Sequence, residues 1–247
     1  MKRKIIVLLI ALVAPVKDYA QTMIDRTLPV KPGQTIDMRF DYPELIRVTT
    51  WERNEISITG SVSINGGEHD DAFILEGSSD GAVIKIRSEI KNLKHLPHRI
   101  VVTEGEKKIM FRNKAELEKY QEANGKDYNS ISWGPEIDIR LEIKVPRDIQ
   151  TNITSVYGFV EVVDFAGPLA VEATYGGVDA ALVEQRVGEL TAETGFGQIY
   201  TNLDLKFSDE QRKSRDFYTF VSAKRGSGPR YSFESKYGNV YLRKAGN

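Results

Sequence analysis

Side chains that could perform chemistry are few and scattered in this sequence. It contains three histidines, His69, His95 and His98, and no cysteine. His95 and His98 are separated by two residues, and His69 precedes two aspartates, so a metal site would have ligands nearby. The intervening proline and the irregular surroundings leave no regular element to hold both imidazoles at ligand distance. We therefore expect loop histidines and no metal centre.

Residues for catalysis also lack a suitable context. Gly226-Ser227-Gly228 is typical of a flexible turn, and Gly195-Phe196-Gly197 lacks the third glycine of a dinucleotide-binding loop. The absence of cysteine removes thiol nucleophiles and disulfides. Acidic residues on an outer face, Asp179, Glu161 and Glu193, could cleave polysaccharide, but they are isolated in sequence. We expect a protein that is not an enzyme and has no cofactor.

The elements that position these residues are mostly strands. Between Thr35 and Ile90 apolar residues recur with period two, which predicts half-buried strands separated by turn residues such as Asn65-Gly66-Gly67. The short connections favour antiparallel hairpins. The alternating residues are Ile36, Met38, Phe40, Ile46, Val48, Ile56, Ile58, Val62, Ile64, Phe73, Leu75, Ile84 and Ile86.

A helical insertion interrupts the strands. Asn113 with Glu116 three residues later forms a capping-box pattern, and Gly125 can end the helix in a left-handed conformation. The sequence thus predicts a helix over residues 113–124, with surface loops over 91–97 and 125–130. Alternation returns in Glu136–Pro146, which predicts the clearest strand of the chain.

A glycine repeat follows this strand. Glycines at 158, 167, 176, 188 and 197 are spaced by 9, 9, 12 and 9 residues, each with an aliphatic residue two positions later. Two units span 18 or 21 residues, close to the coil length of about 20 in narrow solenoids. An aromatic residue precedes the glycine in every other unit: Tyr157-Gly158, Tyr175-Gly176, Phe196-Gly197 and Tyr237-Gly238. We assign these eight residues as structural repeat positions.

The phase of the aromatics predicts where they lie. Val171, Ala173 and Tyr175 share one parity, and the apolar pattern restarts three residues after the aromatic, at Val178. We therefore expect glycine to turn each corner in a conformation closed to other residues, with the aromatics stacked inside the coils. An exposed aromatic strip that stacks on sugars is the alternative. We expect residues 206–216 to be a solvated loop and Tyr237–Arg243 to be an uncovered final coil.

Composition and the amino terminus indicate export. Basic residues at positions 2–4 and a short apolar run over 5–16 precede Ala20, as in a cleaved signal peptide, and this run is shorter than the about 20 residues of a membrane span. Removal of residues 1–20 changes the net charge from −1 to −4. This mildly acidic balance disfavours nucleic acid as a partner.

The chain resembles the bacterial putative-adhesin family of β-strand-repeat domains, which is related to autotransporter adhesin heads. The residues that carry the resemblance are Leu141–Pro146 and the repeats Tyr157-Gly-Phe-Val, Tyr175-Gly-Gly-Val, Phe196-Gly-Gln-Ile and Tyr237-Gly-Asn-Val. The resemblance implies a right-handed β-solenoid and an envelope location. We expect the exported protein in the periplasm, at the outer cell surface or secreted. It implies no established activity.

These patterns together predict an all-β protein. Residues 1–20 form the signal peptide, 21–146 antiparallel strands with the helical insertion, and 147–247 a short parallel β-solenoid. We expect 21–247 to be one continuous domain. We expect a non-catalytic, adhesin-like module that binds glycan, peptidoglycan or an envelope protein. The alternatives are a self-associating structural envelope protein, and thus a homo-oligomer, and a polysaccharide-cleaving β-helix enzyme.

Overall fold

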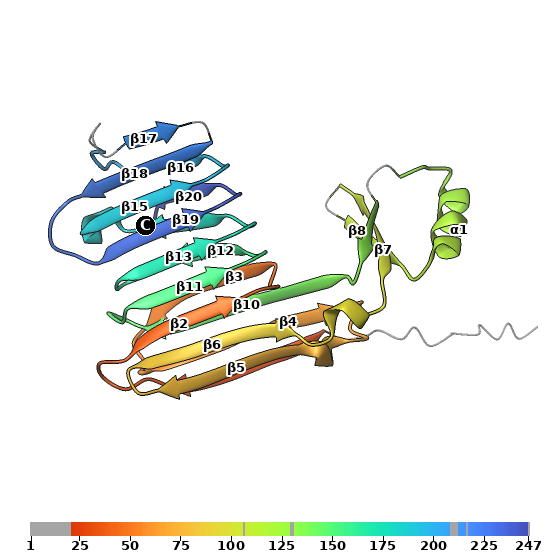
Figure 1. The fold of residues 1–247 in the computed structure, drawn as a ribbon, viewed down its shortest axis with the longest axis horizontal. Coiled ribbons are helices and arrows are strands. Elements are labelled where there is room, and N and C mark those ends of the chain that lie inside the picture. The colour runs from red at the N-terminus through yellow and green to blue at the C-terminus, as the bar shows by residue number, and fades with distance from the viewer. Residues whose placement is uncertain (1–20, 106, 129–130, 208–211, 216, 247) are drawn as a thin grey trace, which may run out of the picture.

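The computed structural model describes residues 21–246 except 106, 129–130, 208–211 and 216, so the predicted signal peptide lies outside the described residues. Two large sheets face each other, and a smaller lobe projects from one side (Figure 1). No helix in the described part of the chain is long and apolar enough to cross a membrane.

The first sheet has eight strands. Their order is β1 (Thr22–Pro29), β4 (Glu55–Ile64), β10 (Ile137–Pro146), β3 (Leu45–Trp51), β12 (Phe159–Val163), β14 (Val178–Leu182), β20 (Val240–Lys244) and β16 (Ile199–Thr201).

The second sheet has nine strands. Their order is β17 (Arg212–Arg215), β18 (Tyr218–Lys224), β15 (Glu189–Thr194), β19 (Arg230–Ser235), β13 (Leu169–Ala173), β11 (Thr151–Ser155), β2 (Thr35–Phe40), β6 (Val83–Ile90) and β5 (Phe73–Asp80). Among the described residues, three short 3-10 turns connect strands: η1 (Asp70–Ala72), η2 (Leu93–His95) and η3 (Glu184–Arg186).

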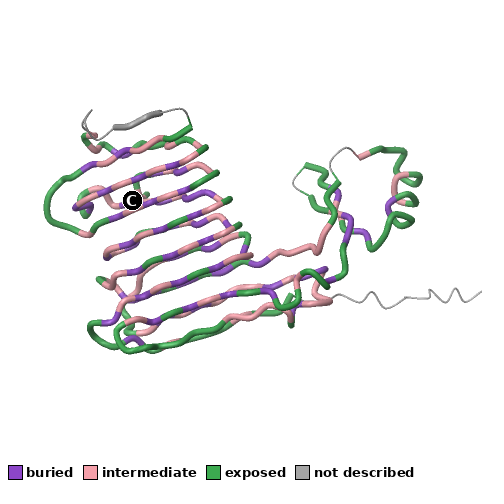
Figure 2. Tube along the Cα trace, in the orientation of Figure 1, coloured by how far each residue is buried: buried purple, intermediate pink, exposed green. Residues whose placement is uncertain are grey.

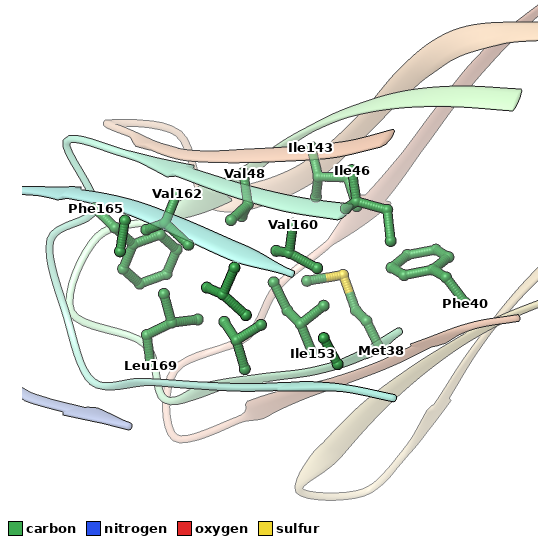
Figure 3. Packing of buried hydrophobic residues seen from close by; sticks show 14 of the residues in the cluster. Met38, Phe40, Ile46, Val48, Ile143, Ile153, Val160, Val162, Phe165 and Leu169 are labelled. Atoms are coloured by element: carbon green, nitrogen blue, oxygen red, sulfur yellow. The ribbon is translucent and has the colours of Figure 1, made fainter. Parts of the chain in front are cut away.

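The core lies between the two sheets. In Figure 3, Val48, Val160 and Val162 from the first sheet face Met38, Ile153 and Leu169 from the second. Buried positions recur along the strands of both sheets (Figure 2), because successive side chains of a strand point to opposite faces. The period-two prediction is confirmed at most positions; Phe73 and Leu75, on the edge strand β5, are only partly buried.

The chain passes from one sheet to the other after almost every strand from β11 onward. Consequently β11 pairs with β13, and β12 with β14, in parallel register. The same happens earlier: β2 and β3 lie in different sheets, and β2 pairs in parallel with both β6 and β11. The predicted antiparallel pairing of the amino-terminal strands is therefore correct for β1–β4 and β5–β6 but wrong for β2 and β3. Their short connection crosses between sheets instead of forming a hairpin.

The last strands of the chain lie inside the stack. β19 is inserted between β13 and β15, and β20 between β14 and β16 (Figure 1). The expectation that Tyr237–Arg243 forms an uncovered final coil is wrong, because backbone partners flank β20 on both sides. The stack instead ends at β16 and β17.

A segment after β16 covers this end of the core. Leu203 is buried, and Leu205 and Phe207 pack partly buried against the core. The polar Asp204 and Lys206 alternate with them, so one face of this segment packs against the core. The predicted solvated loop over 206–216 is only partly correct, because β17 occupies Arg212–Arg215 and pairs with β18.

The projecting lobe contains the predicted helix. α1 spans Lys114–Asn124; Asn113 Oδ1 accepts a hydrogen bond from Glu116 N at 3.0 Å, and Gly125 follows with φ of 61°. The predicted loops over 91–97 and 125–128 contain no strand, only the 3-10 turn η2, and residues 129–130 of the second loop lie outside the described residues. Three strands around the helix were not predicted. β7 (Arg99–Glu104), β8 (Lys107–Phe111) and β9 (Ile131–Gly134) form a small sheet whose Ile100, Val102 and Phe111 bury Leu117 of α1.

Phe233 of β19 provides a test of the inserted strand. Its side chain is fully buried, so Phe233→Ala should lower the free energy of unfolding by about 3–5 kcal/mol through lost burial and a cavity. Phe217→Ala, at a ring that is 75% exposed, is the matched control and should change stability little. Urea denaturation of both variants measures this. Equal effects of the two substitutions would contradict the buried placement of β19.

Candidate functional site

We call two consecutive strands, one in each large sheet, a coil. The aromatic residues of the repeat form a continuous stack along these coils. Adjacent ring centroids are 5.1 to 5.7 Å apart with interplanar angles of 7° to 24°. We call this stack the aromatic ladder; its order is Tyr42, Tyr157, Tyr175, Tyr237, Phe196 and Phe217. Because Phe196 follows Tyr237, the ladder repeats the strand order of the sheets. The predicted ladder exists and extends to two residues, Tyr42 and Phe217, that sequence reasoning missed.

Backbone hydrogen bonds between coils align the rings. Tyr175 N donates to Val156 O at 2.8 Å, Tyr237 N to Thr174 O at 3.0 Å, and Phe196 N to Lys236 O at 2.9 Å. Parallel strands in register place equivalent residues about 4.8 Å apart, a separation at which aromatic rings stack face to face with a small offset. The ladder therefore follows directly from the register of the coils.

The prediction that the aromatics lie inside the coils is wrong. Tyr157, Tyr175, Phe196 and Tyr237 are 43% to 58% exposed. The inward alternation ends at Ser155, Ala173, Thr194 and Ser235, which are buried, and the chain bends immediately afterwards. The parity of the strand does not continue through the bend, so the next aromatic side chain points outward.

The glycine after each aromatic is required by close approach. A Cβ added to Gly176 would lie 2.0 Å from Gly158 O, and one on Gly197 would lie 2.0 Å from Gly238 O. None of the four repeat glycines has a positive φ, so they do not adopt the predicted conformation that is closed to other residues. Gly158, Gly176, Gly197 and Gly238 instead allow the backbone of one coil to contact that of the next.

Hydroxyl groups form hydrogen bonds between the corners of adjacent coils. Ser235 Oγ accepts from Gly238 N at 2.9 Å and donates to Gly176 O at 2.8 Å in the neighbouring coil. Thr194 Oγ1 does the same with Gly197 N and Gly238 O, each at 2.9 Å. Each hydroxyl thus satisfies a donor in its own coil and an acceptor in the next.

The stacking decides what the ladder can bind. Each internal ring is covered on its faces by its two neighbours, so the outward surface consists of ring edges. Sugars stack on ring faces, and only a ring at an end of the ladder, or another aromatic close to it, offers a free face. The exposed strip of sugar-stacking faces considered from the sequence is therefore not present along the ladder.

A groove lies at the Tyr42 end of the ladder, between the stack and the lobe. Its volume is about 740 Å³, and Tyr42, Tyr157 and Trp133 of β9 are among the residues that line it. Trp133 is 64% exposed. We call this the Trp133 groove. It combines aromatic surface with polar groups, as small-molecule and glycan sites do.

Charged groups in the Trp133 groove are of both signs. Lys108 Nζ lies 3.4 Å from Glu44 Oε1, while Lys94 and His98 also line the groove. Burial raises the pKa of Glu136, which lies between the lining residues Pro135 and Ile137. Burial and the neighbouring Tyr157 raise the pKa of Tyr42. These groups provide hydrogen-bond donors and acceptors without a strong net charge.

The histidines are distributed as loop residues. His98 lines the Trp133 groove and His95 ends η2, while His69 precedes η1. Both oxygens of the neighbouring Asp70 accept backbone hydrogen bonds, from Thr22 N at 3.1 Å and Ile64 N at 2.7 Å. Within the described residues no group of three or more His, Cys, Asp or Glu side chains could hold a metal ion.

The three acids singled out from the sequence lie on two sheets. Glu161 and Asp179 face each other across β12 and β14, each within an ion pair: Arg47 lies 2.8 Å from Glu161 and Arg243 lies 2.6 Å from Asp179. Glu193 lies on the other sheet and accepts from the Tyr218 hydroxyl at 2.7 Å. This hydrogen bond and burial raise the pKa of Tyr218 to about 12.

Glu193 also belongs to a row of three carboxylates that sequence reasoning missed. Strand register places Glu172, Glu234 and Glu193 side by side on β13, β19 and β15. Burial, followed by the charges of Glu193 and Glu172, raises the pKa of Glu234. The row forms because β19 lies between β13 and β15, a position that its place in the sequence does not indicate.

A motif that carries the nucleophilic serine in some hydrolases was also missed in the sequence. Gly77-Ser78-Ser79-Asp80-Gly81 has the spacing Gly-x-Ser-x-Gly. In hydrolases this motif occupies a strained strand-to-helix turn, whereas here Ser79 is exposed on the edge strand β5 and accepts from Gln34 Nε2 at 2.9 Å. The spacing without that turn does not indicate a hydrolase.

Comparison with known proteins gives two similar solved structures. The first, a putative cell adhesion protein from Clostridium sporogenes ATCC 15579, is 8% identical with a TM-score of 0.43, over 91% of this chain and 100% of that one. The second, a putative adhesin from Bacteroides fragilis NCTC 9343, is 10% identical with a TM-score of 0.22, over 91% and 98%. No family model and no curated protein matches the chain.

Gly176→Ala tests the close approach of the coils. The added methyl group would meet backbone on the adjacent coil, which cannot move independently, so we expect a loss of about 1–3 kcal/mol in the free energy of unfolding. Gly246→Ala is the control, since its Cβ would meet nothing within 4 Å. Thermal and urea denaturation provide the readout. A Gly176→Ala protein as stable as the control would refute the contact.

Glu234→Gln tests the carboxylate row. A carboxyl whose pKa is raised by folding loses stability as pH rises through its unfolded and then its folded pKa. The amide removes this loss, so the variant should have a higher urea midpoint than the parent at pH 7. At a pH below about 4 the difference should shrink, because the carboxyl is largely protonated in both states. Glu122→Gln, on the exposed surface of α1, should show no such pH-dependent gain.

Proposed function

We propose that this protein is a non-catalytic, adhesin-like binding module of the bacterial envelope, and that it binds a glycan or another envelope component in the Trp133 groove. The observation that carries the proposal is the exposed Trp133 beside Tyr42 and Tyr157 in a groove of about 740 Å³. A sugar presents C–H groups that pack on an aromatic face and hydroxyls that need polar partners. Glu44, Lys94 and His98 supply such partners in the same groove.

The proposed ligand has little net charge. The groove carries both Lys108 and Glu44, already paired at 3.4 Å, and Lys94 is the one further lysine in its lining. The groove has no concentrated basic surface of the kind that binds a strongly anionic polymer or nucleic acid. A neutral glycan or the sugar backbone of peptidoglycan fits this balance better.

We further propose that the coils constitute a right-handed parallel β-solenoid. Successive strands that alternate between two facing sheets and pair in parallel support this interpretation. Parallel strands joined by a crossover are right-handed in the great majority of proteins. The solenoid would present the Trp133 groove at a fixed position relative to the lobe.

The envelope location rests on the sequence of residues 1–20, which has the basic, apolar and small-residue order of a signal peptide. The absence of cysteine is compatible with an oxidising compartment, since no thiol could pair wrongly. The proposed location is the periplasm or the outer surface.

Trp133→Ala tests the groove. Mature protein applied to an array of neutral and charged glycans and to purified peptidoglycan should bind at least one of them. Loss of a central aromatic contact should then weaken binding about tenfold or more. Binding is measured by titration against the identified ligand.

Phe217→Ala is the matched control, because it removes an exposed ring at the opposite end of the aromatic ladder. It should leave the dissociation constant unchanged. No binding to any glycan or envelope fraction would refute the function, and equal losses in the two variants would refute the groove.

A further inference from the structure

The coil formed by β19 and β20 fills a slot between strands that precede it in the sequence. β19 pairs over Arg230–Ser235 with β15 and over Tyr231–Ser235 with β13, in parallel on both sides. β20 pairs with β14 on one side and β16 on the other. β15 has no other strand partner than β18 and β19 within the described sheets, and β16 pairs there with β20 alone. Residues 189–224 are therefore joined to the rest of both sheets through residues 230–244.

The slot is specific for this segment. Tyr231, Phe233, Val240 and Leu242 are at most 2% exposed, and the Tyr231 hydroxyl donates to Phe165 O at 2.7 Å. On the outer corner Ser235 donates to Gly176 O of the preceding coil. Apolar side chains, a buried hydroxyl and a corner hydroxyl all match the slot at once. A second chain with the same residues 230–244 satisfies every one of these contacts.

Residues 225–229, which we call the tether, join β18 to β19 over the surface of the molecule. Arg225–Gly228 is exposed and contains Gly226 and Gly228, with φ of 145° and 151°. It crosses the start of β15, where Gly188 O accepts from Arg225 N at 2.9 Å and Gly188 N donates to Pro229 O at 3.1 Å. The five residues 225–229 that join β18 to β19 can extend over roughly 17 Å, so the tether can straighten and lead away from its own chain.

We propose that residues 230–244 form an exchangeable coil, and that a second copy of this chain can supply it. Two copies would insert their coils reciprocally, each between β13/β14 and β15/β16 of the other. All core contacts of the single chain recur in the exchanged pair, so the difference lies in the tether and in the cost of association. Exchange should accordingly increase with the concentration at which the chains fold. This inference does not depend on the ligand of the Trp133 groove, although a pair would carry two grooves and gain avidity.

A cross-linking experiment distinguishes exchange from ordinary contact. The sequence has no cysteine, so each introduced cysteine is unique. Thr191 of β15 and Ser232 of β19 are register partners with hydroxyl oxygens 3.1 Å apart. Thr191→Cys chains and Ser232→Cys chains are unfolded separately, refolded together at several concentrations, and treated with a short bis-maleimide. Exchange predicts a link between position 191 of one chain and position 232 of another, with a yield that rises with concentration.

Two controls are needed, one for linkage within a single chain and one for strands that do not exchange. The double variant Thr191→Cys/Ser232→Cys shows that the pair can be linked within one folded chain. Arg39→Cys and Thr154→Cys, introduced into separate chains, are register partners on β2 and β11, which do not exchange. The 191–232 link between chains should exceed the 39–154 link several-fold. Equal yields of the two links, or no 191–232 link between chains while the double variant is linked internally, would overturn the proposal.

Discussion

The close backbone contact between successive coils is the constraint on which the rest of this structure depends. At Gly158, Gly176, Gly238 and Gly197 the chain passes so near its neighbour that a Cβ atom would lie 2.0 to 2.3 Å from a carbonyl oxygen. Only glycine satisfies this contact, and it fixes the register of the coils at every corner. The hydroxyls of Ser235 and Thr194 then bridge adjacent corners, and the preceding aromatic rings are held at stacking distance. The aromatic ladder is thus a product of coil register, and its covered ring faces leave the binding role to the groove at its end.

Much of the local structure could be predicted from the sequence, because it depends on local signals. Period-two runs such as Ile36, Met38 and Phe40 identify buried strand faces, and the Asn113 cap with Gly125 defines α1. The recurrence of aromatic-glycine pairs correctly predicts that their rings stack. The direction of those rings could not be obtained in this way, because alternation holds only within a strand and the chain bends between Ala173 and Tyr175.

The order of the coils could not be predicted at all. Each coil carries nearly the same pattern, and Tyr237-Gly-Asn-Val resembles Tyr175-Gly-Gly-Val as closely as any pair in the chain. Order along the sequence is then the simplest assumption, and it is wrong for β19 and β20. Whether a coil fits a slot depends on pairwise details such as Tyr231 reaching Phe165 O, which lies 66 residues away in sequence. The Trp133 groove escaped for a similar reason, since Tyr42, Trp133 and Tyr157 come from three separate segments and meet only in the folded chain.

Amide hydrogen exchange of the carboxy-terminal strands tests the account most directly, because coil order determines which backbone groups are shielded. If β19 and β20 lie inside the stack, the amides of Phe233 and Leu242 should be protected as strongly as those of Val171 and Ala180 in the adjacent coil. Exchange at these positions as fast as on an edge strand such as β5 would place the segment at the end of the stack and contradict the account.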